Sequence, residues 1–403
     1  MAIEIGLEGK IEEEDKDPFL DYLRHLAKHK FCKVNEYENI LQLEVCPEGY
    51  IECSFDQDYV NLVAQSEVAG PGFHAYVAKL YDEIIEECKI EFSVIDATNY
   101  YFDRNFKKLN EQFFYRWIES IASLIKEKKV ATKDWCLAWP KDYYRPLKKE
   151  NTLITPMGYF GFDEFNKDPK ELAPRFFIWN HLEKDALYYR NCAIHYLWKE
   201  CYFEYSKMNE ESDKYAHQII DLLELAHEKD PKLALPLSLY NLLCDTMDCE
   251  KILHDVEDYE IKDIGYRRHD VIYNFGNWCI QAPGTCDADI DETTGAYVLI
   301  APYKSEDESW SWIMRSTAYT FNKTITSFIE LFEEKDQKVM DTFAFEENGV
   351  AVKGNLSQYD GYVAIEAQCN HDCEMMLVSI SIRDLSFKEQ AISMIRNIRW
   401  EAK

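Results

Sequence analysis

The sequence predicts an α+β multidomain protein: an N-terminal α+β domain, an all-helical middle region and a C-terminal α/β sandwich with an antiparallel sheet. Strand-like and helix-like patterns alternate over residues 1–145, the pattern is wholly helical from Trp179, and strand patterns return after Ile261. The 403 residues suffice for two or three domains, each long enough to bury its own core. We therefore expect domains at residues 1–145, 146–260 and 261–403.

In residues 1–145, alternating apolar residues predict strands, and apolar residues three or four apart predict helices. The predicted strands are Ile3–Leu7, Ile40–Cys46, Tyr50–Phe55, Tyr59–Gln65, Ile90–Ile95 and Trp135–Trp139. One predicted helix runs from about Pro18 to Lys30, and a second follows Gly70-Pro71-Gly72. A third begins at Asp103, an N-cap residue type, and ends at about Glu127.

The middle region, 146–260, is predicted to be a connector followed by helices. Residues 185–206 are apolar nearly all round, which indicates a centrally buried helix. A second helix is expected at 212–228 and a third after Pro236. The segment Ala226-His227-Glu228-Lys229-Asp230-Pro231 resembles the end of the second helix of a tetratricopeptide repeat, but no second copy follows at 34 residues. We therefore expect a helical hairpin or a small bundle.

The last 140 or so residues are predicted to form strands and two helices. The strands are Val271–Ile280, Ala296–Ala301, 340–345, 349–354, 361–368 and 374–382, and the helices are 309–334 and 386–398. The order ββαββββα resembles the α/β sandwich of the Mog1/PsbP-like class. The resemblance implies a fold, and it implies no function by itself.

The chain is strongly acidic throughout, with 74 acidic and 45 basic residues and a formal charge of −29. Residues 261–403 hold 23 acidic and 14 basic residues, which leaves 51 and 31 for residues 1–260. A field of this sign repels phosphate groups, which excludes nucleic acid and anionic membrane surfaces as partners, and it attracts a basic protein. The alternative is that the acidity serves solubility.

Cysteine usage predicts a reducing compartment. The thirteen cysteines are an odd number, and most of them lie in apolar runs, so we expect free thiols. The N-terminal residues lack a signal-peptide pattern, and no run of 18 uncharged apolar residues is present. These observations predict a cytoplasmic protein without a membrane span.

Two segments could bind a small anion. Gly72 and His74 lie at a predicted helix start, where free backbone amides can hold an anion. Arg267, Arg268 and His269 form the most cationic short run, which could bind a carboxylate or a phosphate group. The alternatives are an ordinary helix start and a salt-bridge patch that joins domains.

Cys369, His371 and Cys373 form a C-x-H-x-C pattern of residue types that ligate zinc. Structural zinc usually has four ligands, and no second pair lies nearby in the sequence. The alternative is a hairpin turn at Asn370-His371-Asp372 between two alternating strands.

Trp310 and Trp312 lie two residues apart, beside an acidic run, at the start of the predicted helix 309–334. Because residues two apart on a helix do not share a face, at least one Trp is expected to be exposed and to contact a partner. The alternative is that one of them covers the edge of the core.

The sequence favours a soluble, non-catalytic protein-interaction protein, an adaptor or a neutralising protein for a basic protein partner. It contains no nucleotide-binding glycine motif and no nucleophile elbow, and it predicts no cofactor. One alternative is an enzyme whose site lies at an interdomain cleft. The residues that would supply this site are His74, His181, Arg267, Arg268 and His269. Another alternative is a sensor of a small ligand or a metal. The oligomeric state is not predicted.

Overall fold

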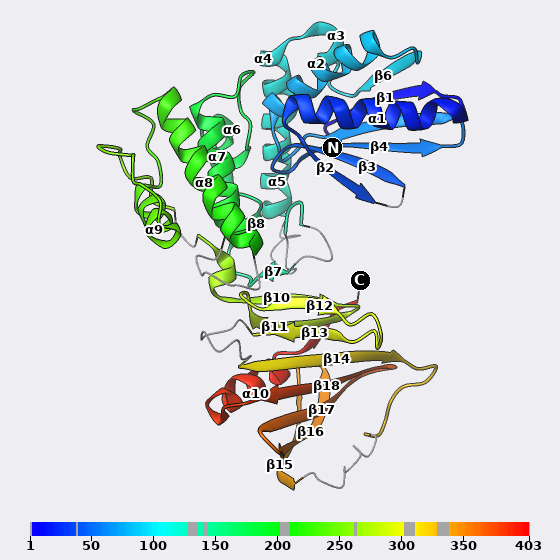
Figure 1. Ribbon diagram of the computed structural model, residues 1–403, viewed down its shortest axis with the longest axis vertical. Coiled ribbons are helices and arrows are strands. Elements are labelled where there is room, and N and C mark those ends of the chain that lie inside the picture. Colours follow the sequence, from blue (N-terminus) through cyan, green and yellow to red (C-terminus); the bar gives the residue numbers. More distant parts are fainter. Residues whose placement is uncertain are drawn as a thin grey trace. The chain divides into compact units, whose positions relative to one another are not determined.

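The computed structural model describes residues 2–37, 39–127, 136–139, 144–201, 210–261, 264–301, 311–328 and 338–402. The chain forms two compact units (Figure 1). Unit 1 comprises Met1–Ala138, Lys148–Glu200 and Tyr215–Ile264, and unit 2 comprises Trp139–Leu147, Cys201–Lys214 and Gly265–Lys403. Helices and antiparallel sheets occur together, which confirms the predicted α+β class. The division into three domains stays a prediction.

Unit 1 contains a six-stranded antiparallel sheet in the order β2-β3-β4-β5-β1-β6. Its strands are β1 (Glu4–Lys10), β2 (Lys33–Tyr37), β3 (Ile40–Cys46), β4 (Gly49–Asp56), β5 (Tyr59–Gln65) and β6 (Phe92–Asp96). All of them except β2 correspond to strands predicted from the alternating pattern, because one face of each is apolar.

Two helices, α1 (Glu13–Lys30) and α2 (Pro71–Glu87), lie against one face of this sheet (Figure 1). Buried side chains of the strands, such as Ile5 and Leu62, face these helices and form the core of unit 1. We call this the inner face. The other face, here the outer face, carries the alternate residues of the same strands, and many of these are exposed.

One further helix of unit 1 differs from its prediction. The helix predicted from Asp103 begins at Phe106 in the structure and consists of α4 (Phe106–Leu109), a π-helical turn (Asn110–Phe114) and α5 (Tyr115–Lys126). A short helix, α3 (Tyr100–Asp103), precedes it. The two are separate because Arg104 has a φ of 50°, which no α-helix permits, and Asn105 then caps α4.

The middle region, 146–260, contains helices, but it is not all-helical, because residues 152–161 form a β-hairpin. Its elements are β8 (Thr152–Thr155), β9 (Gly158–Gly161), α6 (Pro169–Phe176), α7 (Ala186–Lys199), α8 (Glu210–Lys229) and α9 (Leu237–Met247). Nearly every side chain of α7 is buried, as its apolar pattern predicts.

Unit 2 contains a seven-stranded antiparallel sheet in the order β12-β13-β14-β18-β17-β16-β15 and a four-stranded sheet in the order β19-β11-β10-β7. The strands of the first are β12 (Asp287–Ile290), β13 (Tyr297–Ile300), β14 (Trp312–Thr320), β15 (Lys338–Glu347), β16 (Val350–Tyr359), β17 (Tyr362–His371) and β18 (Glu374–Ile382). Those of the second are β7 (Arg145–Pro146), β10 (Asp270–Phe275), β11 (Trp278–Pro283) and β19 (Arg399–Trp400). The closing helix is α10 (Lys388–Arg396).

The helix predicted at 309–334 is wrong where the structure describes it, because residues 312–320 form β14. In β14 Trp312, Met314 and Ser316 are buried while Arg315 is exposed, which is the two-residue period of a strand. The order ββαββββα is therefore not confirmed. The single strand predicted at Val271–Ile280 is also wrong, because Gly276, with a φ of 60°, turns the chain into the hairpin β10–β11.

Among the helices that the structure describes, none is long and apolar enough to cross a membrane.

Candidate functional site

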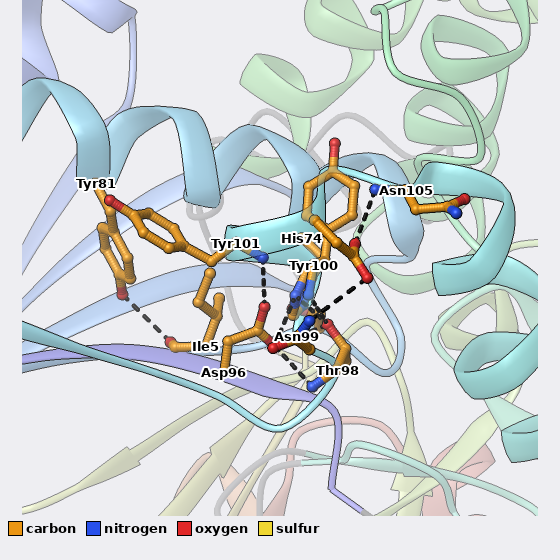
Figure 2. Close-up of polar contacts among 11 residues, drawn as sticks. Ile5, His74, Tyr81, Asp96, Thr98, Asn99, Tyr100, Tyr101 and Asn105 are labelled. Carbon is orange, nitrogen blue, oxygen red and sulfur yellow. Dashed lines mark hydrogen bonds and ion pairs between the residues drawn. The ribbon is translucent and has the colours of Figure 1, made fainter.

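His74 lies in the first turn of α2 and is the centre of a buried polar cluster (Figure 2). Its Nδ1 lies 3.1 Å from the Ser66 hydroxyl, and its Nε2 lies 3.2 Å from the Thr98 hydroxyl and 3.4 Å from Asp96 Oδ1. The side chains of His74 and Asp96 are fully buried. Both ring nitrogens of His74 therefore have hydrogen-bond partners.

Asp96 holds the turn that follows β6 (Figure 2). Its Oδ1 accepts hydrogen bonds from the Thr98 amide at 2.8 Å and the Thr98 hydroxyl at 2.7 Å, and its Oδ2 accepts from the Tyr101 amide at 2.7 Å. Burial alone would raise the pKa of Asp96, but the hydrogen bonds from His74, Tyr101 and Thr98 outweigh it and lower the pKa to about 2.

The cluster contains the residue types of a nucleophilic triad, Ser66, His74 and Asp96, but a catalytic serine must reach its substrate. Ser66 is 0% exposed, so a substrate has no access to its hydroxyl. The arrangement instead ties α2 to the chain after β5 and β6. It satisfies buried polar groups, which is a structural role.

Gly72 leaves no space for a ligand at the start of α2. A Cβ at this position would lie 2.1 Å from Trp179 Cδ1 and 2.3 Å from the His181 carbonyl oxygen. The Gly72 amide already donates to the Trp179 carbonyl oxygen at 2.9 Å. Anion binding by Gly72 and His74 stays a prediction, and this geometry gives it no support. His181 itself is exposed and contacts Asp185.

The basic run of unit 2 is divided between interior and surface. Arg267 is buried, donates from Nε to the Gly284 carbonyl oxygen at 2.8 Å, and lies 4.0 Å from the centre of the Tyr144 ring. Arg268 and His269 are exposed. Arg267 thus has a structural role, and the three residues do not converge on one point. Ligand binding by this run stays a prediction.

Metal binding by Cys369, His371 and Cys373 stays a prediction, and their placement gives it no support. Cys369 is buried in β17. The His371 ring stacks on Trp400 at 4.4 Å, and its Nδ1 lies 2.8 Å from the Gly349 carbonyl oxygen. Nowhere in the described ranges do three or more His, Cys, Asp or Glu lie close enough together to hold a metal ion.

Trp312 is 3% exposed and belongs to the core of unit 2, so it presents no surface to a partner. It is buried because β14, and not a helix, carries it. Trp310 lies outside the described residues.

A cavity of about 390 Å³ opens in unit 1, at one end of the outer face. Its lining consists of Glu48, Tyr50, Glu52, Val63, Gln65, Glu67, Val68, Trp117, Leu137 and Ala138. The volume lies at the small end of the range of ligand pockets, roughly 300–1,000 Å³. Of the five residues predicted for a cleft, His74, His181, Arg267, Arg268 and His269, none lines this cavity.

Three buried ionisable residues contact one another at the cavity, and one of them, Glu48, belongs to its lining. Oε1 of Glu48 accepts from Nε2 of His195 at 3.2 Å and from Nζ of Lys199. The side chains of the three are 9%, 4% and 6% exposed, respectively. Burial, together with the charge of Lys199, lowers the pKa of His195 well below its ordinary value, so the ring is neutral. Glu48 lines the cavity, whereas His195 and Lys199 do not.

The sequence analysis missed the cavity and this cluster. A usable signal exists for His195 and Lys199, because they lie four residues apart on a helix that is otherwise apolar, where a polar side chain needs a partner. The identity of that partner, Glu48 in the β3–β4 turn, has no local signal.

No family model and no curated protein matches this chain. Among solved structures, one similar chain is a protein of Bacteroides thetaiotaomicron, with 13% sequence identity and a TM-score of 0.21. The match covers 32% of this chain and 46% of that chain, so this chain spans less than half of that neighbour. This similarity carries no argument about fold or function.

Proposed function

We propose that this chain is a non-catalytic protein-interaction protein, an adaptor or a neutralising protein, that binds a basic protein through the outer face of the unit 1 sheet. The proposal rests on the chemistry of that face, where carboxylates alternate with exposed apolar side chains. The carboxylates are Glu4, Glu8, Glu44 and Glu52, and the exposed apolar residues are Tyr37, Ile40, Tyr59, Val63 and Ile95.

The centre of the outer face has the composition of a protein contact. Gly6 pairs with Val63 on one side and with Ile95 on the other, so it places no side chain between them. Val63 is 39% exposed and Ile95 is 54% exposed. Glu4 and Glu8, two residues before and after Gly6, lie on the same face of β1. An apolar centre with a charged rim is the anatomy of a protein interface.

The sign of the charge selects a basic partner. The chain carries a formal charge of −29, and its field attracts cations while it repels nucleic acid and anionic membranes. All thirteen cysteines are free thiols, which supports a reducing, cytoplasmic setting for the interaction.

The test is affinity capture of the full chain from its own cell lysate, at about 50 mM and about 300 mM salt. The test variant is Glu4→Gln/Glu8→Gln, and the matched control is Glu346→Gln/Glu347→Gln, two exposed carboxylates on β15 of unit 2. We expect a basic partner that is lost at the higher salt and with the test variant, but retained with the control. A partner that both variants and both salts retain, or no partner, would overturn the proposal.

A further inference from the structure

We infer that the cavity at the end of the outer face receives an arginine side chain of the basic partner. This inference rests on the proposed function and names the group that the partner supplies. The cavity and the outer face are continuous, because Tyr50, Glu52, Val63 and Gln65 belong to both. A partner seated on the outer face therefore lies at the mouth of the cavity.

Glu48 is a buried acceptor with spare capacity. Its side chain is 9% exposed and lines the cavity, and both bonds described above use Oε1. A carboxylate offers about four lone-pair sites, so Glu48 can accept a further N–H group from a ligand that enters the cavity.

Two further carboxylates make the cavity negative. Glu52 accepts a hydrogen bond from the Gln42 amide at 3.0 Å, and Glu67 accepts one from the Ile3 amide at 2.7 Å. Neither has a cation within ion-pair distance among residues with a described position. Lys199 pairs with Glu48 and His195 is uncharged, so Glu52 and Glu67 leave the cavity negative and attractive to a cation.

The walls favour a guanidinium group over an ammonium group. Trp117, Val63 and Leu137 offer flat or apolar surface, and a guanidinium is planar, weakly hydrated and able to stack on such surface. Its five N–H donors can serve several separate acceptors, whereas an ammonium has three. Burial, with the charges of Glu48 and Glu44, raises the pKa of Tyr50, so its hydroxyl stays protonated and adds no charge.

The test is calorimetric titration of the full chain with the peptide acetyl-Gly-Gly-Arg-Gly-Gly-amide at low salt. The comparison peptides replace Arg with citrulline, which is similar in shape but uncharged, or with Lys. We expect the citrulline peptide to bind at least about tenfold more weakly than the Arg peptide, and the Lys peptide to lie between them. No binding of the Arg peptide, or equal binding of the citrulline or Lys peptide, would overturn the inference.

The variants locate the binding in the cavity. Glu52→Gln and Glu67→Gln should each lower the affinity for the Arg peptide by about fivefold to tenfold. The control Glu346→Gln, an exposed carboxylate on β15 of unit 2, should leave the peptide affinity unchanged. Equal effects of the three variants would overturn the inference.

The two proposals can fail separately. Salt-sensitive capture of a basic partner without Arg peptide binding would overturn the arginine site alone. Arg peptide binding without any captured partner would overturn the proposed function, and it would assign the cavity to a guanidinium from another source.

Discussion

At the scale of single residues, the buried polar cluster around His74 in unit 1 supplies its own hydrogen-bond partners. Asp96 illustrates this, because every hydrogen bond to its carboxylate comes from the segment that it organises or from His74 above it. The ionised carboxylate of Asp96 stabilises the folded protein more than the protonated form does, and its lowered pKa expresses this difference.

Asp96 should make folding stability depend on pH in the acid range. Its pKa in the folded protein is about 2, below the ordinary value of 3.8. A lowered pKa contributes stability above the ordinary value, and this contribution is lost as the pH falls from about 4 to about 2. One pKa unit corresponds to about 1.4 kcal/mol, so we expect Asp96→Asn to cost about 2 kcal/mol at pH 6 and little at pH 2. Urea unfolding at both pH values measures this.

The control for this measurement is Asp341→Asn, an exposed carboxylate on β15. Its unfolding free energy should follow that of the unmodified chain at both pH values. If Asp96→Asn costs the same at pH 2 as at pH 6, the carboxylate charge does not stabilise the turn.

Glu48 should be essential for stability as well as for the cavity. Glu48→Gln removes the carboxylate that His195 and Lys199 share inside unit 1, and breaking a buried ion pair typically costs about 3 kcal/mol or more. Glu52→Gln, at an exposed position in the same cavity, should change stability by less than about 0.5 kcal/mol. Thermal unfolding of the two variants measures the contrast, and equal melting temperatures would contradict it.

At the scale of elements, the sequence correctly predicts the helices and strands whose apolar pattern fits only one type of secondary structure. The helix α7 is recognised because Ala193, Leu197 and Trp198 are part of a segment that is apolar on all sides. The strands β3, β4 and β5 are recognised because their residues alternate.

The strand β14 was mispredicted because two periods compete in it. Ala318, Phe321 and Ile325 recur at helical spacing, whereas Trp312, Met314 and Ser316 alternate, and only pairing with β13 and β18 decides between the two periods. That pairing is tertiary, so a local pattern cannot contain it.

Ser316 offers a test of the strand assignment. Its hydroxyl is buried in β14 and has no hydrogen-bond partner within the described residues. Replacing an unsatisfied buried hydroxyl by a methyl group removes a desolvation cost, so Ser316→Ala should stabilise unit 2 by about 1 kcal/mol.

Ser66→Ala is the matched control for Ser316→Ala. The hydroxyl of Ser66 is also buried, but it contacts His74, so the same change should destabilise unit 1 by about 1 kcal/mol. The changes in unfolding free energy that the two substitutions cause should therefore have opposite signs. A loss of stability in Ser316→Ala would show that its hydroxyl is satisfied or exposed.

At the scale of the whole molecule, the sign of the net charge can be predicted from the sequence, but the surface that binds a partner cannot. Alternation predicts that β1 and β5 each have an apolar face and a second face, but not which strands lie side by side. Strand order then brings Val63 and Ile95 to opposite sides of Gly6. The cavity has the same origin, because Glu48 and His195 are 147 positions apart in the sequence and no local pattern indicates that they meet.

Long-range and local charge should affect different rate constants of association with the basic partner. The field of a chain with charge −29 accelerates encounter, and this effect weakens when salt screens it. Removing two charges anywhere, as in Glu346→Gln/Glu347→Gln, should lower kon slightly and leave koff unchanged. Glu4→Gln/Glu8→Gln should lower kon equally but raise koff by about tenfold, because these carboxylates contact the partner in the proposed complex. Surface plasmon resonance at several salt concentrations separates the two constants. An unchanged koff in the second variant would mean that the outer face attracts the partner but does not bind it.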